Sequence, residues 1–292
     1  MPDWDWKALR ATATILEDSA ILAINKPAGL SVMGERHETD IVRLAADSGE
    51  RLFPVHRIDK VTTGVALLAK DLSVHGDLTR QFNKRTVDKR YLIVSENTGL
   101  PAEGMIDLPL AAGRKGTIRI AAPRESIRWD ELEHRWWVSP DDHLPNNKNY
   151  PSLTLFATVW ADSAASLIVA KPVTGRRHQL RVHFAWIGYP VAGDPLFDKA
   201  ASEAGLRTCL HSWRLGIDAG WRRGERIEIE APVGPAPWWP LADRLPAERW
   251  GELLDRARAH RFPDVPNQVL GTGTNSSPVR SRRRGAGIRR VT

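Results

Sequence analysis

An aspartate flanked by two cations is the first feature of this chain with clear chemical potential. Asp59 lies between Arg57 and Lys60 in the segment P-V-H-R-I-D-K-V-T-T-G-V-A-L-L-A-K, a polar turn directly before a strand-like apolar run. Nearby positive charge keeps a carboxylate ionised, and an ionised carboxylate can act as a nucleophile or as a base. The alternative is an aspartate that only makes hydrogen bonds within its own turn. Taken alone, the segment leaves both roles open.

A second polar segment, T-G-R-R-H-Q-L-R-V-H-F, occupies residues 174–184 and is predicted to open a helix with several cations in its first turns. A helix N-terminus reinforced by positive side chains attracts anions. The anion is either a nucleic-acid phosphate or the carboxylate of Asp59, because arginine suits bidentate contact with both. His178 and His183 stand five residues apart and do not share a helix face, so we predict no metal site here.

The motifs along the chain resemble those of the RluA-type pseudouridine synthases. Six segments carry the resemblance: N-K-P-A-G-L at 25–30, H-R-I-D-K-V-T-T-G at 56–64, K-R-Y-L-I-V at 89–94, G-R-R-H-Q-L-R at 175–181, G-D-P-L-F at 193–197 and L-H-S-W-R-L at 210–215. Their order and spacing are similar to the family pattern over roughly residues 15–235. Ile58, Thr63 and Phe197 replace the usual Leu, Ser and Tyr, and none of these changes removes a catalytic group.

The resemblance implies roles for individual residues. Asp59 is then the catalytic aspartate, Tyr91 the aromatic residue that packs on the target base, and Arg181 the arginine that pairs with the aspartate. Lys26 has either a structural or an RNA-contacting role. The candidates for binding the RNA are Lys26, Arg57, Arg176, His178 and Gln179. Neither a metal nor another cofactor is expected.

The implied reaction breaks the glycosidic bond of a uridine, turns the uracil and rejoins it through carbon 5. A carboxylate near C1′ of the ribose can trap or stabilise the sugar, whether by direct attack or through a glycal. An aromatic ring such as that of Tyr91 can replace the stacking that the target base loses. The sequence leaves open whether the substrate is ribosomal or transfer RNA, and which uridine is modified.

Two other functions compete with this one. A noncatalytic RNA-binding protein on the same scaffold would have no need for Asp59, Tyr91 and Arg181, which are all present. An aspartate-dependent hydrolase of small glycosides would need a second carboxylate near the first. Asp194 is the candidate for that second group, but its Gly-Asp-Pro setting favours a turn.

Apolar periodicity predicts the elements that position these residues. We expect two strands within 14–26, and further strands at 65–70, 90–94, 153–160, 166–171 and 226–231. Helices are expected at about 72–83, 178–187 and 241–260. Strands outnumber helices and do not alternate regularly with them. The predicted fold is therefore α+β, with a mixed, largely antiparallel sheet flanked by helices.

Composition divides the chain into a catalytic domain and a tail. Residues 1–270 form the predicted catalytic domain, with an insertion at about 124–152 that leaves the sheet, and without the S4-type N-terminal domain common in the family. Residues 271–292 hold six arginines and no acid, most of the net charge of +7. We expect this tail to be disordered, either as an RNA-affinity arm or as a solvated charge run.

Cysteine content and hydropathy limit the cellular compartment that we expect for the protein. The single cysteine, Cys209, excludes an internal disulfide framework and a multi-cysteine zinc site, which fits a reducing cytoplasm. Neither a signal peptide nor a membrane-length apolar run is present in the sequence. We therefore expect a cytoplasmic, monomeric enzyme whose partner is RNA, with no membrane association and no obligate protein partner.

Overall fold

The computed structural model describes residues 4–34, 39–145, 148–234, 238, 240–241 and 244–265. The predicted arginine-rich tail lies outside the described residues, so its role as an RNA-affinity arm stays a prediction. Within the described part, no helix has the length and apolar character that crossing a membrane requires.

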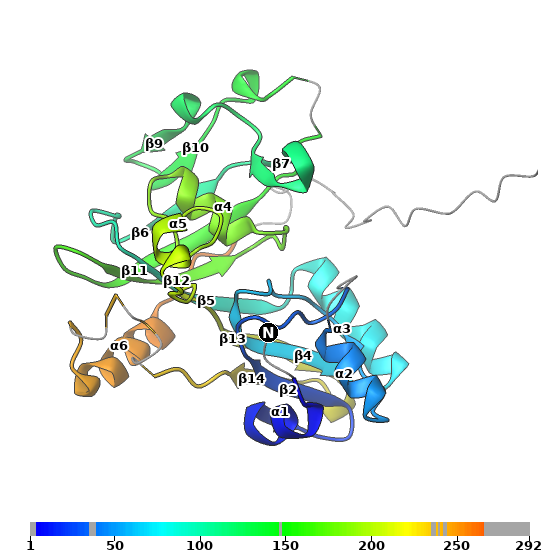
Figure 1. Cartoon of the computed structure of the whole chain (residues 1–292). Helices are drawn as coiled ribbons and strands as arrows, with labels where there is room; N and C mark the ends of the chain where they lie inside the picture. Colours follow the sequence, from blue (N-terminus) through cyan, green and yellow to red (C-terminus); the bar gives the residue numbers. More distant parts are fainter. Residues whose placement is uncertain are drawn as a thin grey trace, which may run out of the picture.

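A large mixed sheet runs through the molecule (Figure 1). In the described residues it has 12 strands, in the order β1-β2-β4-β13-β5-β12-β11-β6-β10-β9, with β14 beside β13 and β3 beside β4. Its strands are β1 (Thr14–Glu17), β2 (Ile21–Lys26), β3 (Phe53–Pro54), β4 (Thr63–Ala69), β5 (Asp88–Ser95), β6 (Glu103–Asp107), β9 (Arg128–Asp130), β10 (Arg135–Trp137), β11 (Leu153–Ala161), β12 (Ser166–Pro172), β13 (Leu210–Ala219) and β14 (Glu225–Glu230). A separate pair is formed by β7 (Leu110–Ala112) and β8 (Ile118–Ile120).

Strand directions confirm the predicted fold class. Among the described strands, β4 runs parallel to β13 and β6 runs parallel to β10, while the other neighbouring pairs are antiparallel. The helices that flank this sheet are α1 (Trp6–Ala13), α2 (Ile41–Asp47), α3 (Leu72–Lys84), α4 (Gln179–Trp186), α5 (Lys199–Glu203) and α6 (Ala247–Ala259). Single 3-10 turns lie at η1 (Arg114–Gly116), η2 (Arg124–Ser126), η3 (Pro140–Asp142) and η4 (Gly220–Arg222).

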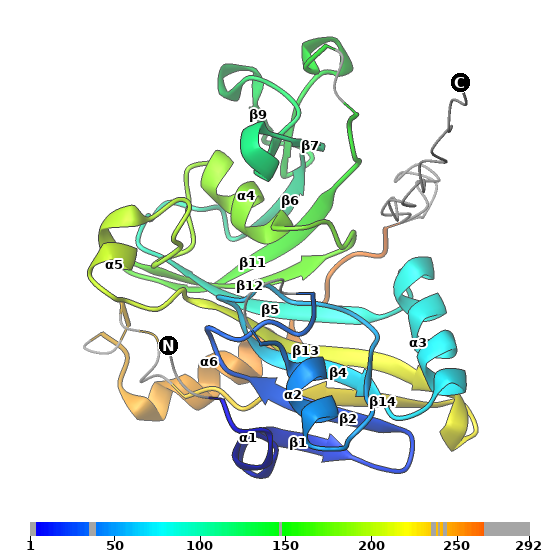
Figure 2. The same ribbon diagram turned by 45° about the vertical axis from the view of Figure 1, so that its right-hand side comes forward.

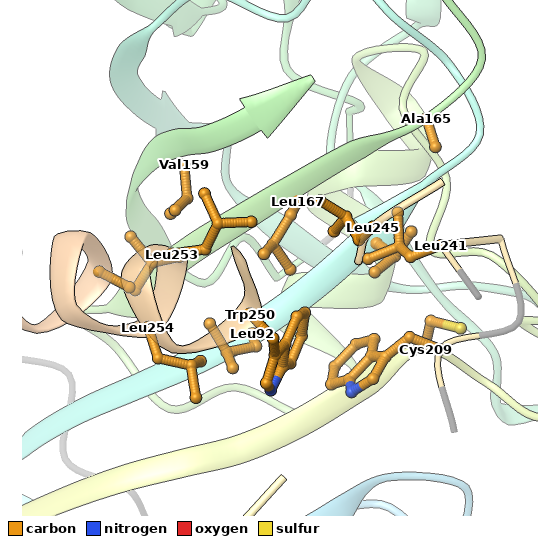
Figure 3. Close-up of a cluster of buried hydrophobic side chains, with 14 of the residues drawn as sticks. Leu92, Val159, Ala165, Leu167, Cys209, Leu241, Leu245, Trp250, Leu253 and Leu254 are labelled. Carbon is orange, nitrogen blue, oxygen red and sulfur yellow. The ribbon is translucent and has the colours of Figure 1, made fainter. Parts of the chain in front are cut away.

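Four apolar clusters hold helices to the two faces of the sheet, and each lies under a different helix or pair of helices. Helix α6 packs through Trp250, Leu253 and Leu254 on Leu92 and Leu167 (Figure 3). The other three clusters lie under α3, under α4, and under α1 with α2. Burying a leucine side chain contributes roughly 1.5–3 kcal/mol, so these helices, α1 to α4 and α6, are held mainly by their apolar faces.

The side chains of β5 alternate between these clusters, as the two-residue period of a strand requires. Leu92 and Val94 belong to the cluster under α6, while Ile93 belongs to the cluster under α4. Tyr91 contacts both the cluster under α4 and the cluster under α1 and α2. Figure 2 shows α4 above the central strands and α1 and α2 below them. Tyr91 therefore lies at the boundary between the two halves of the molecule.

Three sequence-based expectations differ from the structure. Strand β13, near the centre of the sheet, was not predicted, because His211, Ser212 and Arg214 break its apolar pattern. Part of the 124–152 segment returns to the sheet, since β10 pairs with β6 and β9 pairs with β10. The last helix begins at Ala247, later than expected, directly after Pro246. Proline favours the start of a helix and disfavours its interior.

Gly64 offers a direct test of the contact between β4 and β13. Its φ is +105°, and a Cβ placed there would lie 2.2 Å from the carbonyl oxygen of Ser212. We expect Gly64→Ala to lower the free energy of unfolding by more than the roughly 1 to 3 kcal/mol of backbone strain alone. Gly205→Ala is the matched control, because Gly205 has φ +75° and open space around it. Chemical denaturation that showed equal losses for both variants would refute the close approach.

Candidate active site

The loop that carries Asp59 is anchored by His56. The imidazole Nε2 of His56 accepts a hydrogen bond from the backbone N–H of Leu67 in β4 at 3.0 Å, and its ring stacks on Phe82 at 4.9 Å. Burial lowers the pKa of His56 to about 3, so the ring is neutral and can accept this bond. The carbonyl of Asp59 accepts from the backbone N–H of Thr62 at 3.0 Å. The carboxylate is thus presented from a fixed turn.

Lys26 braces the same loop from the end of β2. Its side chain is buried, and its Nζ donates to the carbonyls of Pro27 and Leu30 at 2.7 Å and of Lys60 at 3.3 Å. Burial lowers the pKa of Lys26 to about 7, against the opposing effect of the Asp59 charge. Only the ammonium has donors for all three carbonyls. The sequence left open whether Lys26 has a structural or an RNA-contacting role, and this position favours the structural role.

Arg181 of α4 connects two carboxylates. Its Nε and Nη2 donate to the two oxygens of Asp194 at 2.6 and 2.8 Å, and its Nη1 donates to Oδ2 of Asp59 at 3.2 Å. The side chains of Arg181 and Asp194 are 5% and 0% exposed, whereas that of Asp59 is 17% exposed. Burial would lower the pKa of Arg181, but the hydrogen bonds and charge of Asp194, with the charge of Asp59, raise it. The guanidinium stays charged between its partners.

Asp194 is a member of this site that the sequence interpretation missed. The turn expected from Gly-Asp-Pro is present, since Oδ1 of Asp194 accepts from the backbone N–H of Leu196 at 2.9 Å. The same carboxylate also holds Arg181 in bidentate geometry, which its position in a turn did not reveal. Gly193 allows this placement, because a Cβ there would lie 2.2 Å from the carbonyl oxygen of Arg207.

His178 and Gln179 lie at the start of α4 and differ in what they can reach. His178 has φ +55°, its Nε2 lies 3.8 Å from Oδ1 of Asp59, and its buried Nδ1 has no hydrogen-bond partner among the described residues. Burial lowers the pKa of His178, with the Asp59 charge opposing. Gln179 is buried and uses its amide internally, with Thr174, Leu153, Thr154 and the backbone of Arg176.

One detail of the arginine segment corrects the sequence-based expectation. Helix α4 begins at Gln179, so Arg176 and Arg177 lie in the preceding turn and not in the first helical turn. His183 belongs to the core and is separate from His178. Its ring nitrogens contact the hydroxyl of Thr154 and the carbonyl of Leu108, both at 3.0 Å.

Tyr91 completes the group around Asp59. Burial raises the pKa of Tyr91 to about 12, with the Asp59 charge acting in the same direction and a hydrogen bond to Ser212 opposing. The phenol is therefore protonated at neutral pH. Tyr91 lies in register with Ser212 of β13, Ser212 with Gly64 of β4, and Gly64 with Lys26 of β2. Adjacent strands thus place Lys26 and Tyr91 at two ends of one row beneath the site.

A family model described as RNA pseudouridylate synthase matches residues 20–186, which include Asp59, Tyr91 and Arg181. The chain belongs to this family. The dual-specificity RNA pseudouridine synthase RluA of Escherichia coli K12 is 30% identical over 208 residues, covering 70% of this chain and 85% of that protein. An uncharacterised RNA pseudouridine synthase of Zymomonas mobilis is 32% identical over 234 residues, covering 77% and 95%.

Solved structures agree on the fold of this synthase. The human RNA pseudouridylate synthase domain containing 1 superposes with a TM-score of 0.62 at 22% identity, covering 90% of this chain and 100% of that one. The expected RluA-type family, its fold and its enzyme class, an RNA pseudouridine synthase, are therefore confirmed. Both oxygens of Asp194, the second carboxylate that a hydrolase would use, accept hydrogen bonds from Arg181.

Arg181, His178 and Tyr91 of the synthase thus lie around the carboxylate of Asp59. Arg57 is exposed and lies two residues before Asp59, at the surface of the same loop. Arg176 is half-buried with its guanidinium over the ring of Tyr150, 5.5 Å from the centroid. Lys26 and Gln179, in contrast, make internal contacts that hold the loop and the helix in place.

The unequal burial of the two carboxylates makes a prediction about stability. We expect Asp194→Asn to lower the free energy of unfolding by on the order of 3 to 5 kcal/mol, because it leaves a buried guanidinium without its bidentate partner. Asp59→Asn should cost about 1 kcal/mol or less, since Asp59 is partly exposed and Arg181 keeps Asp194. Urea denaturation of both variants measures the difference, and a larger loss for Asp59→Asn would invert the assignment.

Proposed function

We propose that this synthase isomerises uridine to pseudouridine in ribosomal or transfer RNA, with Asp59 acting at C1′ of the target ribose. The observation that carries the proposal is that the two carboxylate oxygens of Asp59 have different surroundings. Its Oδ2 accepts a hydrogen bond from Arg181, whereas its Oδ1 lies beyond hydrogen-bond distance of His178, at 3.8 Å. One oxygen is held in place and the other is available to the sugar.

The chemistry needs no co-reactant. The bond from C1′ to N1 of uracil breaks, a bond from C1′ to C5 forms, C5 loses a proton and N1 gains one. Asp59 stabilises or traps the sugar carbon while the uracil turns, as carboxylates do at other glycosidic bonds. Arg181 donates a hydrogen bond to the carboxylate and fixes its orientation before the substrate arrives.

Tyr91 is proposed to contact the uracil. Its ring packs against two apolar clusters, and burial raises the pKa of its hydroxyl to about 12. Base stacking on an aromatic side chain contributes about 1–3 kcal/mol. That stabilisation offsets part of the cost of taking the target base out of its stack.

The remaining proposed partners are assigned by position. Arg57, exposed beside Asp59, is proposed to contact the RNA strand, and His178 to approach the ribose. RNA as the substrate class rests on the family, and the Escherichia coli relative is named a dual-specificity RNA pseudouridine synthase. We propose that the enzyme works as a monomer in the cytoplasm, where a single buried cysteine needs no oxidising environment.

Asp59→Asn is the central activity test. We expect it to reduce the single-turnover rate by about 10⁴-fold or more, because the amide is a poor nucleophile and a poor base. RNA affinity should stay within about twofold, since the side chain keeps its shape. Pseudouridine formed in RNA by excess enzyme is quantified by mass spectrometry. Asp218→Asn, an exposed aspartate paired with Arg226, is the matched control and should retain the wild-type rate.

Substantial product from Asp59→Asn would refute the role of Asp59. Mapping pseudouridines in RNA from cells with and without the gene identifies the substrate. Loss of pseudouridine from ribosomal or transfer RNA in the deleted strain supports the proposed substrate class, and loss confined to another RNA contradicts it.

A further inference from the structure

Three cations gather beside the active site without belonging to the network of Asp59. Lys89 lies two residues before Tyr91 on β5, so its side chain leaves the strand on the same side. Its Nζ lies 3.6 Å from the position a Cβ would take on Gly175, in the turn before α4. Arg85 follows α3, and its charge acts on both Lys89 and Arg176. The cluster lies beside the turn that leads to His178 and Arg181.

Like charges at close range repel, so the proximity of Arg85 and Lys89 favours an anion beside them. The neighbouring acid, Asp88, is engaged with Arg90 at 3.3 Å and with Lys171 at 2.9 Å. In the described part of the chain, no carboxylate forms an ion pair with Arg85 or Lys89. Burial, followed by the charge of Arg85, lowers the pKa of Lys89 to about 8. The fold thus holds Arg85 and Lys89 close together, and neither forms an ion pair with an acid of the described residues.

Arg85 occupies a left-handed backbone position at the end of α3. Arg85 ends α3 with φ 61° and ψ 29°, and its N–H donates to the carbonyls of Gln81 and Phe82. Glycine is the residue that helix ends favour in this left-handed conformation, because any Cβ introduces strain there. A glycine would make the same backbone hydrogen bonds. The helix cap therefore does not require the arginine side chain at this position.

Arg176 is oriented by the segment before β11. Its guanidinium lies over the ring of Tyr150 at 5.5 Å, and the ammonium of Lys148 lies over the same ring at 5.4 Å. Backbone hydrogen bonds in both directions join Tyr150 to Leu110. The end of the 124–152 segment thus adds a further cation and fixes the position of Arg176.

We propose that Arg85, Lys89 and Arg176 bind a phosphate of the RNA backbone next to the target nucleotide, with Lys148 at the edge of the site. The proposal rests on RNA being the substrate. A phosphate removes the repulsion among the cations, and arginine and lysine are its usual ligands. The location fits, because the cluster adjoins the turn before α4, and the charge of Lys89 acts on His56 in the Asp59 loop.

The test uses Arg85→Gly, with Arg223→Gly as the matched control. Both arginines have left-handed backbone, with φ 61° and φ 56°, but Arg223 ends η4, where Trp221 and Arg222 contact Asp18. The probe is a stem-loop RNA containing a uridine that the wild-type enzyme modifies. We expect Arg85→Gly to weaken RNA binding by about tenfold. The slope of log K against log salt should become shallower by about 0.7 to 0.9, as expected for one lost phosphate contact.

Thermal stability separates binding from a structural role. Both glycine variants should melt at or above the wild-type temperature, because each removes a strained backbone. Lys89→Met is the second variant and should also melt no lower than wild type, while it weakens RNA binding with the same loss of slope. The phosphate site would be overturned if Arg85→Gly and Lys89→Met both showed the same slope of log K against log salt as Arg223→Gly. Wild-type protein that forms no pseudouridine would instead contradict the proposed function, so the two failures are distinguishable.

Discussion

The guanidinium of Arg181, held between two carboxylates, is the interaction on which the site depends. A buried positive charge is stable only when it is paired and its N–H groups are satisfied. Asp194 provides this pairing with both of its oxygens, at 2.6 and 2.8 Å. Because Asp194 already neutralises Arg181, the remaining Nη1 can orient Asp59 without enclosing it. Asp59 thereby stays fixed yet partly exposed, which a carboxylate acting on a bulky RNA substrate requires.

The surrounding fold limits how far these groups can move. His56 and Lys26 attach the Asp59 loop to β4 and to the segment after β2 through hydrogen bonds to the backbone. Helix α4 brings Arg181 to the loop, and its Leu180 and Phe184 belong to the apolar cluster beneath it. Pairing across β2, β4, β13 and β5 sets the separation of Lys26 and Tyr91. A displacement of about 1 Å in such a site can cost about 10²-fold in rate, so rigid support of this kind contributes to catalysis.

The sequence predicted correctly those features whose signal lies within one short segment of the chain. The segments around Asp59 and Arg181 and the apolar periodicity of α3 and β12 each lie within one short window. It failed where a role arises from contacts distant in the chain. Strand β13 is buried among neighbours, and its polar residues obscured its alternation. Asp194 stands 13 positions from Arg181, and a Gly-Asp-Pro turn carries no sign of what its carboxylate faces. The sequence likewise assigned no role to Arg85 or to Lys89 of the K-R-Y-L-I-V motif, because their proximity depends on β5 and the 174–176 turn.

The most direct test of this account is the single-turnover rate of Asp194→Asn at saturating RNA, measured where the variant is folded. Asp194 does not touch the substrate in this scheme, so RNA affinity should remain within about twofold of wild type. The rate of pseudouridine formation should nevertheless fall by about 10²-fold, because Arg181 no longer holds Asp59 in its reactive orientation. A folded Asp194→Asn enzyme with a rate within about twofold of wild type would show that Asp59 does not depend on this arrangement, and would contradict the account.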